Sequence, residues 1–468
     1  MKLRKICALA LAASLIVSSA LAATPKEPKV RASNTNISFN DGINDDLINQ
    51  AKGANAKPDA TYNLYNIQDS DLASFVTAFP DVMKLEISSK ELTNIAPLSK
   101  LVKLEKLIIR ADKVSDIVPL GELTKLTDLT LESKNITDIT PIAKLQALTQ
   151  ISLTLEKVTD MTPVGTIAGL KRINAKMGAS DLKWMSKLTN LLNISINGEN
   201  VTSIEGLPNL PTIREISLRY IKPTNLEPIL ALPGLTKLGL NYADLTKTDL
   251  TALAKLTKLA NIDLYGAKIK DFSPLAACPA LKELMYYATK GSDYSTLGKI
   301  TQIEILKGGL TDLKDISWVS TLPNLKKFDV FAEYVTDYTP LTNCKKLEYF
   351  QIWSMRVPLD MTSLSKVTWL KTLKVWSMDG VINLSAIGNM TGLEHLILQD
   401  VNSKGGDPIN VADFAKLPNL KKLDLSSSKR VTGFDKLTAP LLTDLTLDKN
   451  ISDEQLKGLP QTIKVRKY

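Results

Sequence analysis

The stretch LTDLTLESKNITDITPIAKL, residues 126–145, carries apolar residues at positions 1, 4, 6, 11, 14, 17 and 20. The stretches that begin at Leu104 and Leu148 repeat this pattern, so the period is 22 residues. One such unit is too small to bury its own apolar side, and consecutive units therefore have to stack into a solenoid. Position 1 recurs, mostly in steps of 22 residues, at Val82, Leu104, Leu126, Leu148, Leu170, Leu191, Ile213, Leu235, Leu259, Leu281, Ile303, Leu325, Leu347, Leu370, Leu393, Leu420, Leu442 and Ile463.

Each unit predicts one short strand followed by a return segment. Residues 129–131 alternate apolar and polar side chains, which is typical of a strand with one buried face. Several units then contain Asp-Ile/Met/Phe-x-Pro, as at residues 116–119 and 271–274. Proline lacks a backbone donor and fixes φ, so we expect an extended or 3₁₀ return. The units around residues 242–256 and 361–367 lack this proline, and we expect longer helical turns there.

This unit resembles the leucine-rich repeat of the internalin type, and the resemblance covers about residues 82–465. It implies an α/β fold: a leucine-rich repeat solenoid, a horseshoe or superhelix with short parallel strands on the concave face. The resemblance also implies 3₁₀ or irregular returns on the convex face and a small helical N-terminal cap. The family usually has asparagine at position 9, whereas this column reads Lys90, Asp112, Lys134, Glu156 and Ala267, with Asn450 as an exception. The pattern therefore predicts the repeat fold, and not kinship with the host-invasion proteins.

Four segments are expected along the chain. Residues 1–23 have the features of a secretory signal peptide, with basic residues, an apolar stretch and then small residues. Residues 24–40 are polar and contain two prolines, so we expect a disordered linker. Residues 41–81 form the predicted N-terminal cap. Residues 82–468 form a repeat array of about 17 coils with a C-terminal capping strand.

The predicted cap contains helices at residues 45–51 and 69–78 and a strand at residues 62–67. At the other end, the charged residues within 461–468 would keep an edge strand soluble. We expect a protein that is secreted, periplasmic or at the cell surface, with no membrane span once the signal peptide is removed. We also expect a monomer.

Net charge argues against a nucleic-acid partner. The chain carries a formal charge of +9, and the predicted signal peptide contributes three of these charges through Lys2, Arg4 and Lys5, which leaves +6. Spread over the rest of the chain, this is a mild bias and not the basic stripe that a polyanion requires.

The cysteines predict no disulfide and no metal site. Cys278 and Cys344 both occupy position 20, an inward site, and lie three coils apart. At about 4.8 Å between strands the separation is roughly 14 Å, and a disulfide needs Cα atoms within about 7 Å. The single histidine, His395, is far from both. We therefore expect two buried thiols, no metal and no cofactor.

One outward column predicts a binding surface. Positions 3, 5 and 7 face out of the concave sheet. Position 7 is polar in the first half of the array and then carries five aromatic residues in six coils, interrupted only by Gly309. These are Tyr265, Tyr287, Phe331, Trp353 and Trp376; Tyr349, Met285 and His395 extend the patch at positions 3 and 5, with Asp329, Gln351 and Lys374 beside it. The rings could anchor a ligand or form a ladder that stabilises the sheet.

The leading functional hypothesis is a secreted, non-catalytic recognition protein that binds a protein or peptide through this concave face. The resemblance to internalins implies a partner on a host or neighbouring cell surface. The alternative is a carbohydrate-binding protein in which the rings stack on sugars and Asp329, Lys327, Gln351 and Lys374 take the hydroxyl groups. No catalytic residues are expected. The minor alternative, a glycoside hydrolase, would rest on Asp263 and Glu283.

Overall fold

A computed structural model describes residues 28–33, 35–54, 57, 59–287, 292–310, 313–353, 356–376, 380–402 and 405–468. The predicted signal peptide lies outside these residues and stays a prediction. Within them, every helix is too short or too polar to cross a bilayer.

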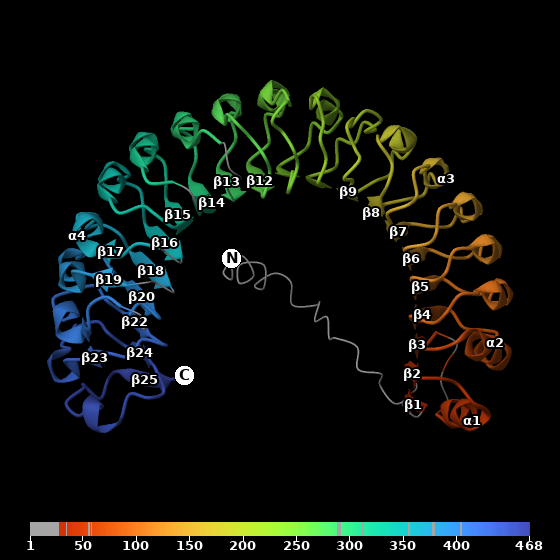
Figure 1. Ribbon diagram of the computed structural model, residues 1–468, viewed down its shortest axis with the longest axis horizontal. Helices are drawn as coiled ribbons and strands as arrows, with labels where there is room; N and C mark the ends of the chain where they lie inside the picture. The colour runs from red at the N-terminus through yellow and green to blue at the C-terminus, as the bar shows by residue number, and fades with distance from the viewer. Residues whose placement is uncertain are drawn as a thin grey trace.

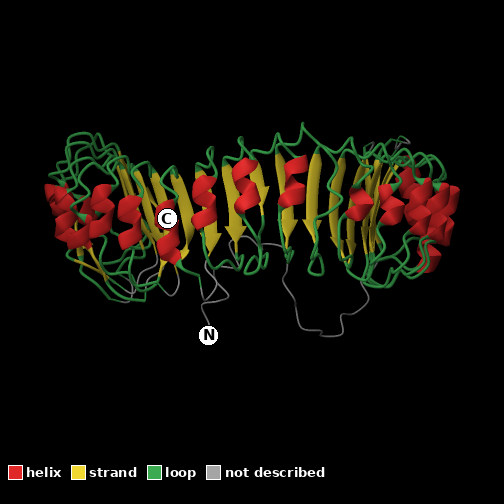
Figure 2. Ribbon diagram, turned by 90° about the horizontal axis from the view of Figure 1, so that it is seen from above, coloured by secondary structure: helices red, strands yellow, loops and turns green. Residues whose placement is uncertain are grey.

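The molecule is an arc with strands along its inner side and short helical turns along its outer side (Figures 1 and 2). The described residues form one sheet of 21 strands, parallel except that β1 pairs antiparallel with β2. Its strands are β1 Lys29–Ala32, β2 Asn36–Asn40, β3 Thr61–Tyr65, β4 Lys84–Ser88, β5 Lys106–Arg110, β6 Asp128–Glu132, β7 Gln150–Leu155, β8 Arg172–Met177, β9 Asn193–Asn197, β10 Glu215–Arg219, β11 Lys237–Gly239, β12 Asn261–Tyr265, β13 Glu283–Tyr287, β14 Ile305–Leu310, β15 Lys327–Ala332, β16 Tyr349–Trp353, β18 Thr372–Trp376, β20 His395–Gln399, β22 Lys422–Leu425, β24 Asp444–Leu447 and β25 Lys464–Lys467. The predicted solenoid is confirmed, and β25 is the last strand of its sheet.

The returns are mostly single 3₁₀ turns, as the proline pattern predicts. They are η2 Ala96–Lys100, η3 Val118–Glu122, η4 Thr140–Lys144, η5 Lys183–Met185, η6 Glu227–Ala231, η7 Thr251–Lys255, η8 Ser273–Ala277, η9 Tyr294–Lys299, η10 Ser317–Thr321, η11 Thr339–Asn343, η12 Leu384–Asn389, η13 Val411–Phe414, η14 Phe434–Lys436 and η15 Glu454–Leu456. Two returns are single α-turns, α3 Thr162–Gly165 and α4 Met361–Leu364. Neither α4, with four residues, nor η7, with five, is longer than its neighbours, so the expectation of longer helical turns is wrong for both residues 242–256 and residues 361–367, although α4 is an α-turn.

Short outer strands flank the returns of four late coils. Strand β17 Leu359–Asp360 pairs with β19 Val381–Ile382, and β21 Ile409–Asn410 pairs with β23 Val431–Thr432. The insert in the longest repeat step lies beside them. The Arg430 guanidinium donates to the carbonyl oxygens of Asn402, Gly405 and Gly406 at 2.9–3.1 Å, so this insert is tied to the next coil.

The apolar positions of the repeat form one continuous core. Leu126, Leu129, Leu131 and Ile136 of the defining stretch are each at most 1% exposed, and the equivalent side chains of the other coils are buried in the same way. Burying a leucine contributes roughly 2 kcal/mol. Because each coil packs against its neighbours, this stabilisation extends along the whole array.

Serine at position 8 closes the turn after the strand in coils that lack the asparagine of the family pattern. Ser133 is 4% exposed; its hydroxyl donates to the Val114 carbonyl at 2.6 Å and accepts from the Asn135 N–H at 3.1 Å. Ser89 makes the corresponding contacts with Ile67 and Glu91. A buried hydroxyl with both functions satisfied can replace a side-chain amide there.

The N-terminal cap is larger than the sequence predicts. Its helices α1 Asp45–Gly53 and α2 Asp69–Ala78 and its strand β3 lie where the pattern places them. The expectation of a disordered linker over residues 24–40 is wrong for β1 and β2, which extend the sheet. The reason is that Ile37 and Phe39, both 0% exposed, complete the core of the cap; polar composition concealed this short alternating segment.

The cap core can be tested through Phe39. Its ring contacts those of Phe75 and Phe79, with centroids 6.1 Å apart in each pair. We expect Phe39→Ala to lower the free energy of unfolding by about 3–5 kcal/mol, because it leaves a cavity in a packed core. The exposed Arg31→Ala is the control and should change it by less than about 0.5 kcal/mol. Urea denaturation measures both, and equal, negligible effects would contradict a role of this segment in the fold.

A second prediction concerns acid stability. Asp138 and Asp160 precede their return turns and have pKa values below the ordinary 3.8, because each carboxylate accepts from the hydroxyl and then the backbone N–H of the threonine two residues on. A lowered folded-state pKa contributes stability that is complete above pH 3.8 and is lost as the pH falls further. The urea midpoint should therefore fall between pH 5 and pH 2.5.

The matched variant is Asp138→Asn with Asp160→Asn. The amide oxygen of asparagine can accept the same hydrogen bond, as Asn225 does from the Glu227 N–H at 3.1 Å. Unlike a carboxylate, the amide does not titrate. The double variant should therefore show a shallower acid dependence of the urea midpoint. An acid dependence as steep as that of the wild type would contradict the assignment.

Candidate binding surface on the concave sheet

The five predicted aromatic side chains lie in one row. Strand pairing sets Tyr265 opposite Tyr287, then Gly309, and continues through Phe331, Trp353 and Trp376 to Gln399. The row runs across β12, β13, β14, β15, β16 and β18 on the inner side of the arc (Figure 1). Because the core sets the register, a column of the sequence becomes a continuous surface feature.

The rings of this row are half-buried. The centroids of Tyr265 and Tyr287 are 4.7 Å apart, and those of Trp353 and Trp376 are 4.3 Å apart with the planes tilted by 44°. These contacts are in the range of favourable aromatic pairs. Four of the five rings therefore pair with a neighbour, and all five remain partly exposed, so the ladder and the binding anchor both stay open.

Two tyrosines that the sequence reasoning missed lengthen the row. Tyr220 and Tyr242 stack with centroids 4.8 Å apart, and Tyr242 meets Tyr265 edge-on at 5.4 Å. Both sit at position 8, which alternation places inside. Their φ values of 61° and 57° turn them out of that pattern. A large aromatic residue directly after the strand, where Ser89 or Ala111 stands in other coils, is the signal that could have revealed them.

Gly309 interrupts the row because Tyr287, in the preceding coil, occupies the space that a side chain would need. The Tyr287 ring leans over Gly309, so that a Cβ there would lie 2.8 Å from Tyr287 Cδ1. Its neighbour Gly308 sits against the backbone of Tyr286, and a Cβ would lie 2.0 Å from the Tyr286 carbonyl oxygen. Tyr286 is 1% exposed at an inward position that smaller aliphatic residues usually occupy. Two glycines therefore accommodate two adjacent tyrosines.

The polar neighbours of the row are already engaged with one another. Trp353 Nε1 donates to Asp329 Oδ1 at 2.9 Å, and the Tyr349 hydroxyl donates to Gln351. Gln351 is only 5% exposed. Of the candidates for ligand contact, Asp329 therefore orients Trp353, and Gln351 supports Tyr349 from within the sheet.

Basic groups surround Tyr349. The ammonium groups of Lys327 and Lys374 lie 4.2 and 5.5 Å from its ring centroid. Burial, with a further effect of the Asp329 charge, raises the pKa of Tyr349 to about 12, so its hydroxyl stays protonated as a donor. Met285 lies in the same row as Lys307, Asp329, Gln351 and Lys374, at position 5.

Trp376 ends the aromatic row with an unsatisfied donor. Its Nε1 is buried and has no hydrogen-bond partner among the described residues. This atom differs from Trp353 Nε1, which Asp329 holds.

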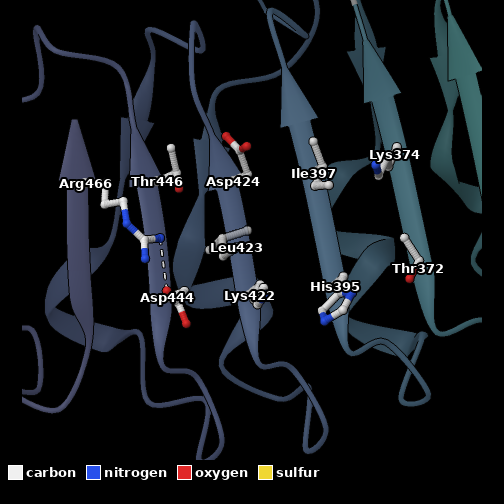
Figure 3. Close-up of a pocket in the computed structure, with 10 residues that line it drawn as sticks. All are labelled: Thr372, Lys374, His395, Ile397, Lys422, Leu423, Asp424, Asp444, Thr446 and Arg466. Atoms are coloured by element: carbon white, nitrogen blue, oxygen red, sulfur yellow. Dashed lines mark ion pairs between the residues drawn. The ribbon is translucent and has the colours of Figure 1, made fainter. Parts of the chain in front are cut away.

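His395 belongs to a different part of the surface. It starts β20, in register with Thr372 and Lys422. There it lines a hollow of about 330 Å³ together with Lys374, Ile397, Leu423, Asp424, Asp444, Thr446 and Arg466 (Figure 3). A second hollow, of about 390 Å³, lies on β6–β9 in the polar half of the array and is lined by residues such as Thr130, Ser152, Asn174 and Ser195.

Groups that could have served catalysis are occupied or buried. Glu283 accepts from Asn261 Nδ2 at 2.8 Å and pairs with Lys307 at 2.5 Å. Asp263 accepts from the Tyr265 N–H at 3.0 Å. Cys278 and Cys344 are free, fully buried thiols, and burial raises the pKa of each to about 11. In the described part of the chain, no three metal-ligating side chains of His, Cys, Asp or Glu come together.

Comparison with known proteins supports the fold. No family model matches the chain, and no curated protein sequence matches it significantly. Among solved structures, it is similar to a leucine-rich repeat protein of Leptospira interrogans, at 17% identity and a TM-score of 0.50, over 85% of this chain and 99% of that one. It is also similar to the internalin InlF of Listeria monocytogenes, at 22% identity and a TM-score of 0.36, over 75% of this chain and 82% of that one. The fold is a leucine-rich repeat solenoid, and the resemblance seen in the sequence is confirmed at that level.

The two neighbouring glycines of β14 offer a test of the row. We expect Gly308→Ala to lower the free energy of unfolding by about 2 kcal/mol or more, because the new Cβ meets a backbone carbonyl that cannot move aside. Gly309→Ala should cost less than about 1 kcal/mol, because it meets only the movable ring of Tyr287. Urea denaturation compares the two variants. Equal costs would contradict this account of the gap.

Proposed function

We propose that this protein is an exported, non-catalytic recognition protein that binds a protein partner through the concave face of its solenoid. The observation that carries the proposal is the row of half-buried rings from Tyr265 to Trp376, in register along the sheet. We take residues 1–23 as its signal peptide, residues 29–81 as its cap and the array as a single recognition unit that acts as a monomer.

Physical reasoning favours the row as a binding anchor. The rings are mounted on a hydrogen-bonded sheet and partly fixed by one another, so binding costs them little conformational entropy. Trp353 is also oriented by Asp329. Tryptophan and tyrosine in such settings commonly supply most of the free energy of protein recognition.

A protein partner fits this surface better than a sugar. A carbohydrate site would need free acceptors beside the rings. Of the acceptors expected for that role, Gln351 is only 5% exposed and accepts from Tyr349, and Asp329 already uses one oxygen to accept from Trp353. The engagement of Glu283 by Asn261 and Lys307 likewise supports a non-catalytic function.

The aromatic row can be tested by removing its two tryptophans. The wild-type chain, immobilised, would be screened against cell-surface extracts and, in parallel, against a glycan array. For a protein captured by the wild type, we expect the double variant Trp353→Ala/Trp376→Ala to bind at least about tenfold more weakly, because buried aromatic anchors dominate such interfaces.

The matched control is Thr154→Ala/Asn197→Ala, which alters the same position 7 in the polar half of the array and should bind within about twofold of the wild type. Thermal melting of both variants checks that the solenoid is intact. An unchanged affinity of the tryptophan variant would sink the proposal, and selective binding of glycans would favour the carbohydrate alternative.

A further inference from the structure

The hollow around His395 collects basic groups from adjacent coils. Lys374 comes from β18, His395 from β20, Lys422 from β22 and Arg466 from β25 (Figure 3). Two carboxylates, Asp424 and Asp444, share the hollow with them. Whether an anion can bind here depends on which of these charges are already paired.

Both carboxylates are committed within the protein. Asp424 Oδ1 accepts from the Ser426 N–H at 2.9 Å, and its Oδ2 accepts from Gln399 Nε2 at 3.1 Å. Asp444 pairs with Arg466 at 3.0 Å and accepts from the Thr443 hydroxyl at 3.0 Å.

The basic groups at the centre of the hollow form no ion pair within the described part of the chain, although Lys374 Nζ lies 5.5 Å from the Tyr349 ring centroid. Lys422 lies in register with Asp444 and, after the hydrogen bond from Thr443, helps to lower the pKa of that carboxyl. Lys374 and Lys422 form no ion pair with any described residue, whereas their sequence neighbours Lys371 and Lys421 pair with Glu348 and Glu394 at 2.7 and 2.6 Å. Of these four lysines, the two that pair with glutamate lie at position 2, and the two without an ion pair line the hollow on the concave face.

His395 adds a titratable group between the two free lysines. Its pKa is lowered by partial burial and by Lys422, with smaller effects of Lys421 and Lys374 in the same direction and an opposite effect of Glu394. Asp424, Asp444 and Arg466 are the other charged groups around the hollow. An anion bound beside the imidazole would favour its protonated form and so raise its pKa.

We propose that this hollow binds a carboxylate side chain of the protein partner, held by Lys374 and Lys422 with His395 between them. With a neutral imidazole, the three cations Lys374, Lys422 and Arg466 exceed the two carboxylates by one charge. One excess charge suits a monoanionic carboxylate better than a dianionic phosphate. The inference rests on the proposed function, since it assigns an acidic residue of the partner to a position beside Trp376, which shares β18 with Lys374.

The single histidine of the chain makes the hollow directly observable. With ¹³C-labelled histidine, the full-length protein gives one imidazole Cε1–H resonance, whose pH titration reports the pKa of His395. The probe is a blocked hexaglutamate peptide at constant ionic strength, with the corresponding hexaglutamine peptide and inorganic phosphate as comparisons. We expect hexaglutamate to raise the pKa of His395 and to bind about threefold more tightly at pH 5.5 than at pH 7.5, because an added partly exposed ion pair has a modest effect.

Lys422→Met should weaken hexaglutamate binding at least about threefold and reduce the change in the His395 titration. The control is Lys106→Met, which removes an exposed lysine from position 3 of β5 and should leave both unchanged. An unmoved histidine titration would overturn the proposal, as would a stronger response to phosphate than to hexaglutamate. Equal effects of the two lysine variants would also overturn it, because they would indicate nonspecific attraction.

This titration needs no natural partner. A failure here therefore leaves the tryptophan experiment intact, and a failure of the tryptophan experiment leaves this one intact.

Discussion

The whole molecule depends on the register between neighbouring coils. A coil of this kind cannot bury its apolar side chains alone, so Leu129 must stack between Leu107 and Ile151, and the same holds along the array. Once the inward residues are aligned, the alignment of the outward residues with those of the next coil is fixed as well. A column of the sequence becomes a row on the surface, about 4.8 Å per step, whatever its chemistry.

Because the register is fixed, the side chain at a given repeat position lies beside the side chain at the same position of the next coil. At position 2 the charges alternate along Lys282, Glu304, Lys326, Glu348, Lys371, Glu394 and Lys421, and ion pairs join four of the six adjacent pairs. Each exposed pair contributes little, but like charges in register would repel. At position 7 the same rule brings aromatic rings together. Position 3 departs from it, because Lys84 lies beside Lys106 there and His395 lies beside Lys422, with no acidic residue between the members of either pair.

The sequence predicted what the period controls, and it could not predict what local backbone geometry or side-chain pairing controls. The strands, the buried stripe and the order of the rings from Tyr265 to Trp376 all follow from periodicity. Tyr220 and Tyr242 were missed because a left-handed residue reverses the alternation. β1 and β2 were missed because two buried residues in a polar segment give almost no periodic signal. The hydrogen bonds of Gln351 to Tyr349 and of Asp329 to Trp353 depend on side-chain rotamers, which the repeat pattern does not specify.

The ladder and the binding surface do not compete for the same rings. Ring contacts restrict the orientation of the paired rings Tyr265–Tyr287 and Trp353–Trp376, and the surface that stays exposed is carried on a hydrogen-bonded sheet with little entropy left to lose. The hollow around His395 differs, because Lys374 and Lys422 form no ion pair with any described residue, although Lys374 lies near the Tyr349 ring and Lys422 lies in register with Asp444. The concave face therefore combines an aromatic section, in which neighbouring rings contact one another, with a charged section around His395, in which Lys374 and Lys422 form no ion pair with any described residue.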